Sequence, residues 1–190
     1  LEDPNTTPPD DMWKLTQSPQ KAPDTPEKIT IEFKQGIPVK VTKTESGESY
    51  TDSVDVFLQL NALARKHGIG RVDIVENRFI GVKSRGCYES PGATILRAAH
   101  IDLEGLTLDR EVRRLRDQIV TTKFSEILYY GFFFSPESKY VRGCIPPSQT
   151  TVNGVVKLSL YKGNVVIEGR SSNELLYDEK FSSMDELGGF

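Results

Sequence analysis

Two stretches near opposite ends of the chain, residues 29–41 and 156–167, alternate between apolar and polar side chains around a short polar turn. The turns are Lys34-Gln35-Gly36 and Lys162-Gly163-Asn164. A period of two gives each strand one apolar face, and a glycine-containing turn between two such strands predicts an antiparallel hairpin. Pro38 lacks a backbone N–H, so the second strand of the first hairpin should lie at a sheet edge or at a bulge. The chain is therefore expected to build a mainly antiparallel sheet.

Between the two hairpins the apolar spacing changes to that of helices. One helix is expected after Asp52 or Ser53, either of which can cap it, and before Gly68, a residue that commonly follows a helix end. Its apolar positions are Val56, Phe57, Leu60, Leu63 and Ala64. A second helix should start at Ser90-Pro91 and run to about Glu104, because serine caps a helix and proline fits its first turn.

Two further helices are expected in the second half of the chain. The longer should begin near Thr107 and continue towards Tyr130, with an apolar stripe on one side and a solvated charged face on the other. The stripe consists of Val112, Leu115, Ile119 and Ile127, and the charged face of Arg113, Arg114, Arg116 and Asp117. The shorter helix starts at Ser135-Pro136-Glu137 and should fail at Pro146-Pro147, because proline removes a donor and clashes with the preceding turn. Helices interspersed with hairpins predict an α+β fold, in which a mainly antiparallel sheet with hairpins packs against several helices.

The first 27 residues differ in composition from the rest. They hold six of the eleven prolines, which block both helix and ladder formation. We expect residues 1–27 to form an extended lead-in, either draped on a partner or disordered, followed by one domain over residues 28–190. Trp13 is the only tryptophan in the chain. An exposed indole is uncommon, so Trp13 should anchor the lead-in.

The charge balance excludes two classes of partner. The chain has 24 basic and 27 acidic residues and a net charge of -3, with no run of five like charges. It therefore lacks the electrostatic footprint of nucleic-acid or membrane-surface binding. The longest apolar stretch, around residues 127–134, is too short to cross a bilayer, and the start of the sequence lacks the basic and apolar segments of a signal peptide. We expect a soluble, cytoplasmic protein.

Cysteine and histidine are too scarce for a disulfide scaffold or a zinc site, so no metal is expected. Cys87 has no neighbouring base to activate it and is interpreted as a half-buried structural cysteine. His67 lies at a helix end, where it suits the helix dipole, and His100 is interpreted as a structural histidine within a helix. The aromatic run at 129–134 has no basic surroundings and is interpreted as core or interface.

The densest cluster of charged and aromatic groups lies at residues 76–89. It supplies a carboxylate, two guanidiniums, an amine and a phenol, which together can bind a zwitterionic ligand. From composition alone, a charged hairpin with internal salt bridges is the alternative, and the better supported one. Its strands are expected at residues 72–75 and 79–82, around a polar turn at 76–78.

The same region carries a resemblance. The string from Gly70 to Gly86, followed by Tyr88-Glu89 and residues 91–96, closely resembles argininosuccinate synthases. Further matches include Lys66-His67-Gly68 and residues 107–112, and essentially all 190 residues fit the family in order. The resemblance implies a fold like that of the family's carboxy-terminal domain.

The family's enzymes join citrulline to aspartate using ATP. The ureido oxygen of citrulline attacks the α-phosphate to give citrullyl-AMP and pyrophosphate, and the aspartate amine then displaces AMP. The resemblance implies that Glu76 and Tyr88 are citrulline contacts, and the candidates for supporting contacts are Arg78, Lys83, Ser84 and Arg85. It implies no catalytic residue within these 190 residues.

The resemblance also implies partners beyond this sequence. The family's amino-terminal domain binds ATP with Mg²⁺ and aspartate, and this sequence has no Gly-rich phosphate loop of its own. In the family, a carboxy-terminal helix that contacts neighbouring subunits of a homotetramer would follow the position of Phe190. The domain is therefore expected to be truncated at that end. We expect the 190-residue chain to supply citrulline and subunit contacts and to be inactive alone. The alternative is a non-catalytic citrulline-binding or assembly module with the same fold.

Overall fold

The central sheet has the strand order β3-β2-β1-β6-β7, and every neighbouring pair is antiparallel. The structure is a computed structural model and describes residues 2–178. The strands of the central sheet are β1 (Glu27–Lys34), β2 (Ile37–Lys43), β3 (Ser49–Tyr50), β6 (Gly154–Tyr161) and β7 (Asn164–Ser171). A separate two-stranded hairpin consists of β4 (Arg71–Asn77) and β5 (Lys83–Glu89).

The helices fall into two groups. Two long helices lie against the sheet, α1 (Ser53–Lys66) and α2 (Pro91–Thr107). The others form a helical arm: α3 (Arg110–Arg116), the π-helical η3 (Asp117–Thr121), α4 (Thr122–Tyr129), α5 (Pro136–Gly143) and α6 (Ile145–Gln149). Two 3-10 turns, η1 (Asp10–Met12) and η2 (Pro19–Lys21), interrupt the lead-in. Among the helices of residues 2–178, none is both long and apolar enough to cross a membrane.

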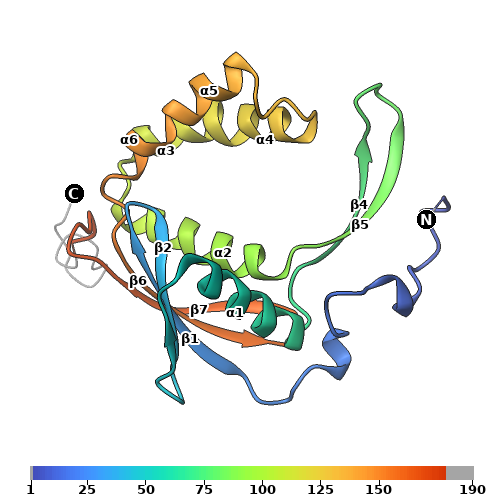
Figure 1. The fold of residues 1–190 in the computed structure, drawn as a ribbon, viewed down its shortest axis with the longest axis horizontal. Helices are drawn as coiled ribbons and strands as arrows, with labels where there is room; N and C mark the ends of the chain where they lie inside the picture. The colour runs from blue at the N-terminus through green and yellow to red at the C-terminus, as the bar shows by residue number, and fades with distance from the viewer. Residues whose placement is uncertain (1, 179–190) are drawn as a thin grey trace, which may run out of the picture.

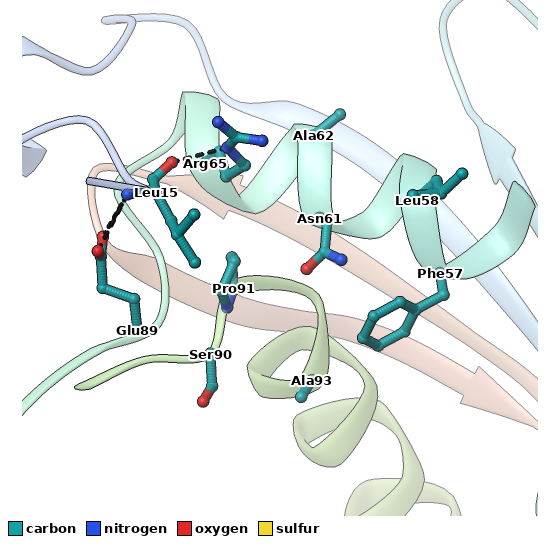
Figure 2. Close-up of a pocket in the computed structure, with 10 residues that line it drawn as sticks. All are labelled: Leu15, Phe57, Leu58, Asn61, Ala62, Arg65, Glu89, Ser90, Pro91 and Ala93. Carbon is teal, nitrogen blue, oxygen red and sulfur yellow. Dashed lines mark hydrogen bonds between the residues drawn. The ribbon is translucent and has the colours of Figure 1, made fainter. Parts of the chain in front are cut away.

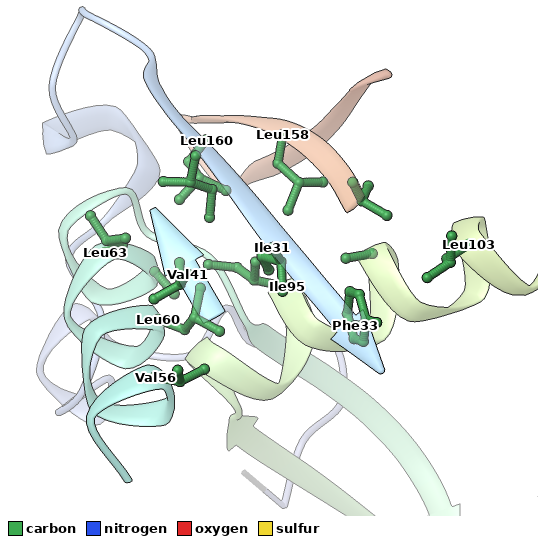
Figure 3. Packing of buried hydrophobic residues seen from close by; sticks show 14 of the residues in the cluster. Ile31, Phe33, Val41, Val56, Leu60, Leu63, Ile95, Leu103, Leu158 and Leu160 are labelled. Atoms are coloured by element: carbon green, nitrogen blue, oxygen red, sulfur yellow. The ribbon is translucent and has the colours of Figure 1, made fainter. Parts of the chain in front are cut away.

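The main core lies between one face of the sheet and helices α1 and α2 (Figures 1 and 3). Alternation along β1 buries Ile29, Ile31 and Phe33, while the opposite face is polar. There, Lys28 pairs with Glu168 on β7 at 2.9 Å. Ile31 is 0% exposed, so its truncation to alanine should cost about 2 to 5 kcal/mol. The α+β prediction is confirmed.

Both predicted hairpins of the central sheet are confirmed. The two-residue turns Gln35-Gly36 and Lys162-Gly163 have positive φ at both positions, which suits the right-handed twist of the strands. The β1–β2 register shifts between Glu32 and Phe33, opposite Pro38. The bulge expected at Pro38 is therefore present.

Helix α1 also follows its prediction. The Asp52 side chain accepts hydrogen bonds from the backbone N–H groups of Val54 and Asp55 at 2.9 and 3.2 Å. At the other end Gly68 adopts a left-handed φ of +69°. Helix α2 starts with Pro91 in its first turn, but the Ser90 side chain makes no capping hydrogen bond, so this part of the prediction is wrong.

The helical arm has a small core of its own, built from Val120, Ile127 and Val141. The predicted apolar stripe is therefore only partly buried: Ile127 is in this core, whereas Val112, Leu115 and Ile119 remain 40%, 56% and 42% exposed. The prediction that a helix fails at Pro146-Pro147 needs correction. Helix α5 ends earlier, at Gly143, and both prolines lie in the first turn of α6, where a missing N–H costs little.

The arm is attached to the body of the molecule through a buried ion pair. Arg116 on α3 donates to the fully buried Glu104 of α2 at 2.6 Å, and Gln149 of α6 donates to the same oxygen at 2.9 Å. His100 lies 2.8 Å from the Gln149 side-chain oxygen. The prediction that Arg116 belongs to a solvated face is therefore wrong, because a charged partner lies on the neighbouring helix.

Candidate functional site

The β4–β5 hairpin projects from the sheet and carries the residues of the sequence-predicted site (Figure 1). Its strands pair from Arg71↔Glu89 at the base to Asn77↔Lys83 near the tip. The turn lies at residues 78–82, so the expected turn at 76–78 and the expected strand at 79–82 are wrong. Opposite residues share a face, which places Glu76, Ser84 and Tyr88 on one side. We call this side the front face.

The two proposed citrulline contacts meet on the front face. The phenol of Tyr88 donates a hydrogen bond to a carboxylate oxygen of Glu76, although Tyr88 is paired with Val72, four positions away along β4. This hydrogen bond, followed by partial burial and the charge of Glu76, raises the pKa of the Tyr88 phenol. Tyr88 is 47% exposed, so the pair is accessible to a ligand.

The candidates for supporting contacts do not all join this pair. Ser84 lies directly opposite Glu76, on the front face. Lys83 and Arg85 belong to the other face, which we call the back face, and Arg78 lies in the turn. All four nevertheless border one open hollow, which Glu2 and Pro4 of the lead-in also line.

Arg85 is engaged by groups other than Glu76. It binds both carboxylate oxygens of Asp73 on the back face, at 2.8 and 2.7 Å. Its remaining terminal nitrogen donates to the backbone carbonyls of Asp3 and Thr6 at 2.9 and 2.7 Å. The hydrogen bonds from Arg85 hold the pKa of Asp73 below its usual value. Arg85 therefore fastens the lead-in to the hairpin.

A second attachment of the lead-in lies at the base of the hairpin. The Glu89 carboxylate accepts from the backbone N–H groups of Lys14, Leu15 and Thr16, at 2.8, 2.9 and 2.7 Å, and from the Thr16 hydroxyl at 2.7 Å. Figure 2 shows Leu15 held from two sides, with its N–H directed to Glu89 and its carbonyl bonded to Arg65 of α1 at 2.7 Å. Burial raises the pKa of Glu89, but these hydrogen bonds outweigh it and lower the pKa overall.

Arg71 completes this attachment. It donates to the Thr16 hydroxyl and carbonyl, both at 2.7 Å, and its guanidinium lies 5.0 Å from the ring centre of Trp13. The prediction that Trp13 anchors the lead-in is confirmed, and the surface it anchors to is the hairpin of the same chain. No local sequence pattern marks Arg71 and Glu89 as anchors, because the residues that they bind lie more than fifty positions away.

The tip of the hairpin contacts the helical arm. The Tyr129 hydroxyl at the end of α4 donates to the backbone carbonyl of Asn77 at 2.8 Å. The Phe79 ring meets the Tyr130 ring edge to face, with ring centres 4.9 Å apart. The aromatic run at 129–134 thus serves in part as an intramolecular contact, and it positions the strand end next to Glu76.

Two other titratable residues that the sequence singles out, Cys87 and His67, have environments typical of residues with a structural role. Burial, and secondly the charge of Asp73, raise the pKa of the Cys87 thiol, which favours the unreactive protonated form. His67 is fully buried, and its Nε2 lies 3.3 Å from a Glu27 carboxylate oxygen. Both agree with the structural interpretation of these residues.

Comparisons with known proteins show the family of the chain. The family model of the arginosuccinate synthase C-terminal domain matches residues 1–190. The chain is 57% identical to argininosuccinate synthase of Saccharomyces cerevisiae over 195 residues, 59% identical to that of Schizosaccharomyces pombe over 191 residues and 50% identical to that of Homo sapiens over 190 residues. In each comparison the match covers 100% of this chain and 46% of the relative, so the chain spans about half the length of these curated relatives. The chain belongs to the argininosuccinate synthase family and corresponds to its C-terminal domain.

Proposed function

We propose that this chain supplies the citrulline-binding hairpin of an argininosuccinate synthase, the ligase that condenses citrulline with aspartate using ATP. The observation that supports this role is the convergence of Glu76 and Tyr88 on the accessible front face of β4–β5. Membership of the family supports the assignment of this reaction. The convergence of Glu76 and Tyr88 supports their assignment as citrulline contacts.

The chemistry of the pair suits citrulline. A carboxylate accepts hydrogen bonds from an ammonium or from ureido N–H groups, and a phenol can donate and accept. Glu76 and Tyr88 share one hydrogen bond, which leaves further acceptor sites on the carboxylate and on the phenol oxygen for a ligand. In this role they bind and orient citrulline and do not transfer protons. ATP with Mg²⁺ and aspartate are assigned to the amino-terminal domain of the family, so the 190-residue chain alone should be inactive.

Subunit contacts are proposed for an exposed apolar surface of the helical arm. Val112, Leu115 and Ile119 lie exposed in one row there, and Pro147 and Cys144 border the same apolar hollow. Such a surface suits burial against another subunit of a homotetramer. In the full-length enzyme, Leu115→Glu should reduce the assembly measured by light scattering, whereas an unchanged mass would assign the contacts elsewhere.

The citrulline role is tested by Tyr88→Phe in the full-length enzyme. The chain offers a matched control, because the hydroxyl of Tyr50 on β3 also donates to a glutamate, Glu48, just before that strand. Tyr88→Phe should raise the KM for citrulline roughly three- to tenfold, as expected for one lost hydrogen bond, and leave those for ATP and aspartate unchanged. Tyr50→Phe should change none of the three. An equal citrulline KM in both variants would remove Tyr88 from the site.

A further inference from the structure

Gly86 lies between Ser84 and Tyr88 on the front face of β5, directly opposite Ile74. A strand interior is an unfavourable place for glycine, which gains no side-chain packing and loses more chain entropy than other residues. Eight other glycines of the described chain adopt a positive φ, which favours glycine by itself, but Gly86 is not among them. Backbone conformation therefore gives no reason for glycine at position 86, whereas the surrounding space does.

The space at position 86 is filled by the ring of Tyr88. A Cβ atom on residue 86 would lie 2.3 Å from Cε2, 2.5 Å from Cζ and 2.6 Å from the hydroxyl of Tyr88. These distances are far inside van der Waals contact. The Tyr88 ring consequently lies over the backbone of residue 86, and Gly86 is buried.

This path brings the phenol to Glu76. Tyr88 is paired with Val72 and Glu76 with Ser84, and Ile74 and Gly86 form the one pair that lies between them on the front face. A side chain at position 86 would occupy the space that the Tyr88 phenol fills between Val72 and Glu76. We infer that Gly86 is a positioning residue, whose missing side chain lets Tyr88 cross the strand and meet Glu76. The predicted effect of Gly86 on citrulline binding rests on the proposed function, whereas its predicted effect on the position of the Tyr88 side chain does not.

The inference predicts an unusual outcome for Gly86→Ala. The backbone of residue 86 accepts alanine, and the obstructing atoms belong to a half-exposed side chain that can swing away. The fold should therefore be retained, with a melting temperature equal to or above that of the parent, since alanine is ordinarily better than glycine in a strand. Tyr88, however, should lose its hydrogen bond to Glu76.

The experiment compares Gly86→Ala with Gly169→Ala in the full-length protein. Gly169 is a strand glycine on β7 with an ordinary φ, and a Cβ there would meet only the Lys157 side chain, at 3.9 Å. The position of Tyr88 is measured by NMR titration of tyrosines labelled with ¹³C at Cζ, assigned by Tyr88→Phe. In the parent protein the hydrogen bond to Glu76 raises the pKa of Tyr88. In Gly86→Ala this pKa should fall towards the ordinary tyrosine value. An unchanged Tyr88 pKa in Gly86→Ala would overturn the inference.

Kinetics with the same variants separate this inference from the citrulline role. Gly86→Ala should raise the citrulline KM roughly three- to tenfold, like the loss of the Tyr88 hydroxyl, and Gly169→Ala should not. In a Tyr88→Ala background the Gly86→Ala change should add nothing, because the obstructed ring is gone. A further rise in that background would contradict a role through Tyr88. A lowered Tyr88 pKa with an unchanged citrulline KM would support the positioning role and overturn the citrulline role.

Discussion

Arg71 and Glu89 face each other across the base of the β4–β5 hairpin, and both bind Thr16 of the lead-in. Arg71 donates to Thr16, and Glu89 accepts from it and from the two preceding backbone N–H groups. An isolated two-stranded hairpin is only marginally stable in water. The lead-in therefore braces the hairpin that carries Glu76 and Tyr88.

Release of the lead-in is predicted for Glu89→Ala. The change removes an acceptor shared by three backbone N–H groups and the Thr16 hydroxyl, and hydrogen bonds to a charged group contribute about 1.5 to 3 kcal/mol. Trypsin should then cleave after Lys14 roughly tenfold faster or more, while far-UV circular dichroism stays unchanged. Glu45→Ala, at an exposed turn position, is the control. Equal cleavage rates in the two variants would show that Glu89 does not hold the lead-in.

Acid should release the same attachment. The folded-state pKa of Glu89 lies below its ordinary value of 4.5, so the attachment is at full strength above that pH and is lost as the pH falls through the lower folded-state value. Emission of Trp13, the only tryptophan, should shift as the pH is lowered through the depressed pKa of Glu89, below 4.5. In Glu89→Gln this transition should disappear. The prediction fails if parent and variant titrate alike, since other carboxylates would then be responsible.

The attachment of the helical arm to α2 is predicted to depend on Arg116. Arg116→Met leaves the fully buried Glu104 carboxylate without its cation, which should lower the free energy of unfolding by about 3 to 5 kcal/mol in urea denaturation. Arg114→Met removes an exposed pair with Glu111 and should cost less than about 1 kcal/mol. Adding Glu104→Gln to Arg116→Met should restore part of the loss. Equal stabilities for the two single variants would contradict a structural role for the buried pair.

The parts of the fold that were predictable from sequence are those whose signals are local. The hairpins at Gln35-Gly36 and Lys162-Gly163 combine a period of two with turn residues that accept positive φ, and α1 carries its own cap in Asp52. Each of these signals lies within a few residues of the feature it specifies. They were therefore read correctly from the sequence alone.

The β4–β5 turn was misplaced because its residues look like strand. Phe79 and Val82 sit at the tip, where the polar residues of an ordinary turn would be expected, and Phe79 packs on Tyr130 of the helical arm. The hairpin also projects from the sheet, so neither face shows the alternation that burial imposes. Tertiary contacts with the arm, and not local propensity, account for the position of this turn.

The candidate site was only partly predictable for the same reason. The family resemblance indicates Glu76 and Tyr88, whereas the candidates for supporting contacts, Arg78, Lys83, Ser84 and Arg85, are their neighbours in sequence. In a strand, neighbours point to opposite faces, so Lys83 and Arg85 lie on the other side from Ser84. The register of the strands, which the structure supplies, separates Ser84 on the front face from Arg85, which holds the lead-in.

The most direct test of the account is Glu76→Gln in the full-length enzyme, with each of the three substrates varied in turn. The change keeps the shape of the side chain and removes its charge, so the citrulline KM should rise at least about tenfold, while those for ATP and aspartate stay within a few-fold. Glu48→Gln, in the second tyrosine–glutamate pair, should leave all three constants unaltered. An unchanged citrulline KM in Glu76→Gln, or an equal rise for all three substrates with a lowered melting temperature, would contradict the assignment of the β4–β5 front face as the citrulline site.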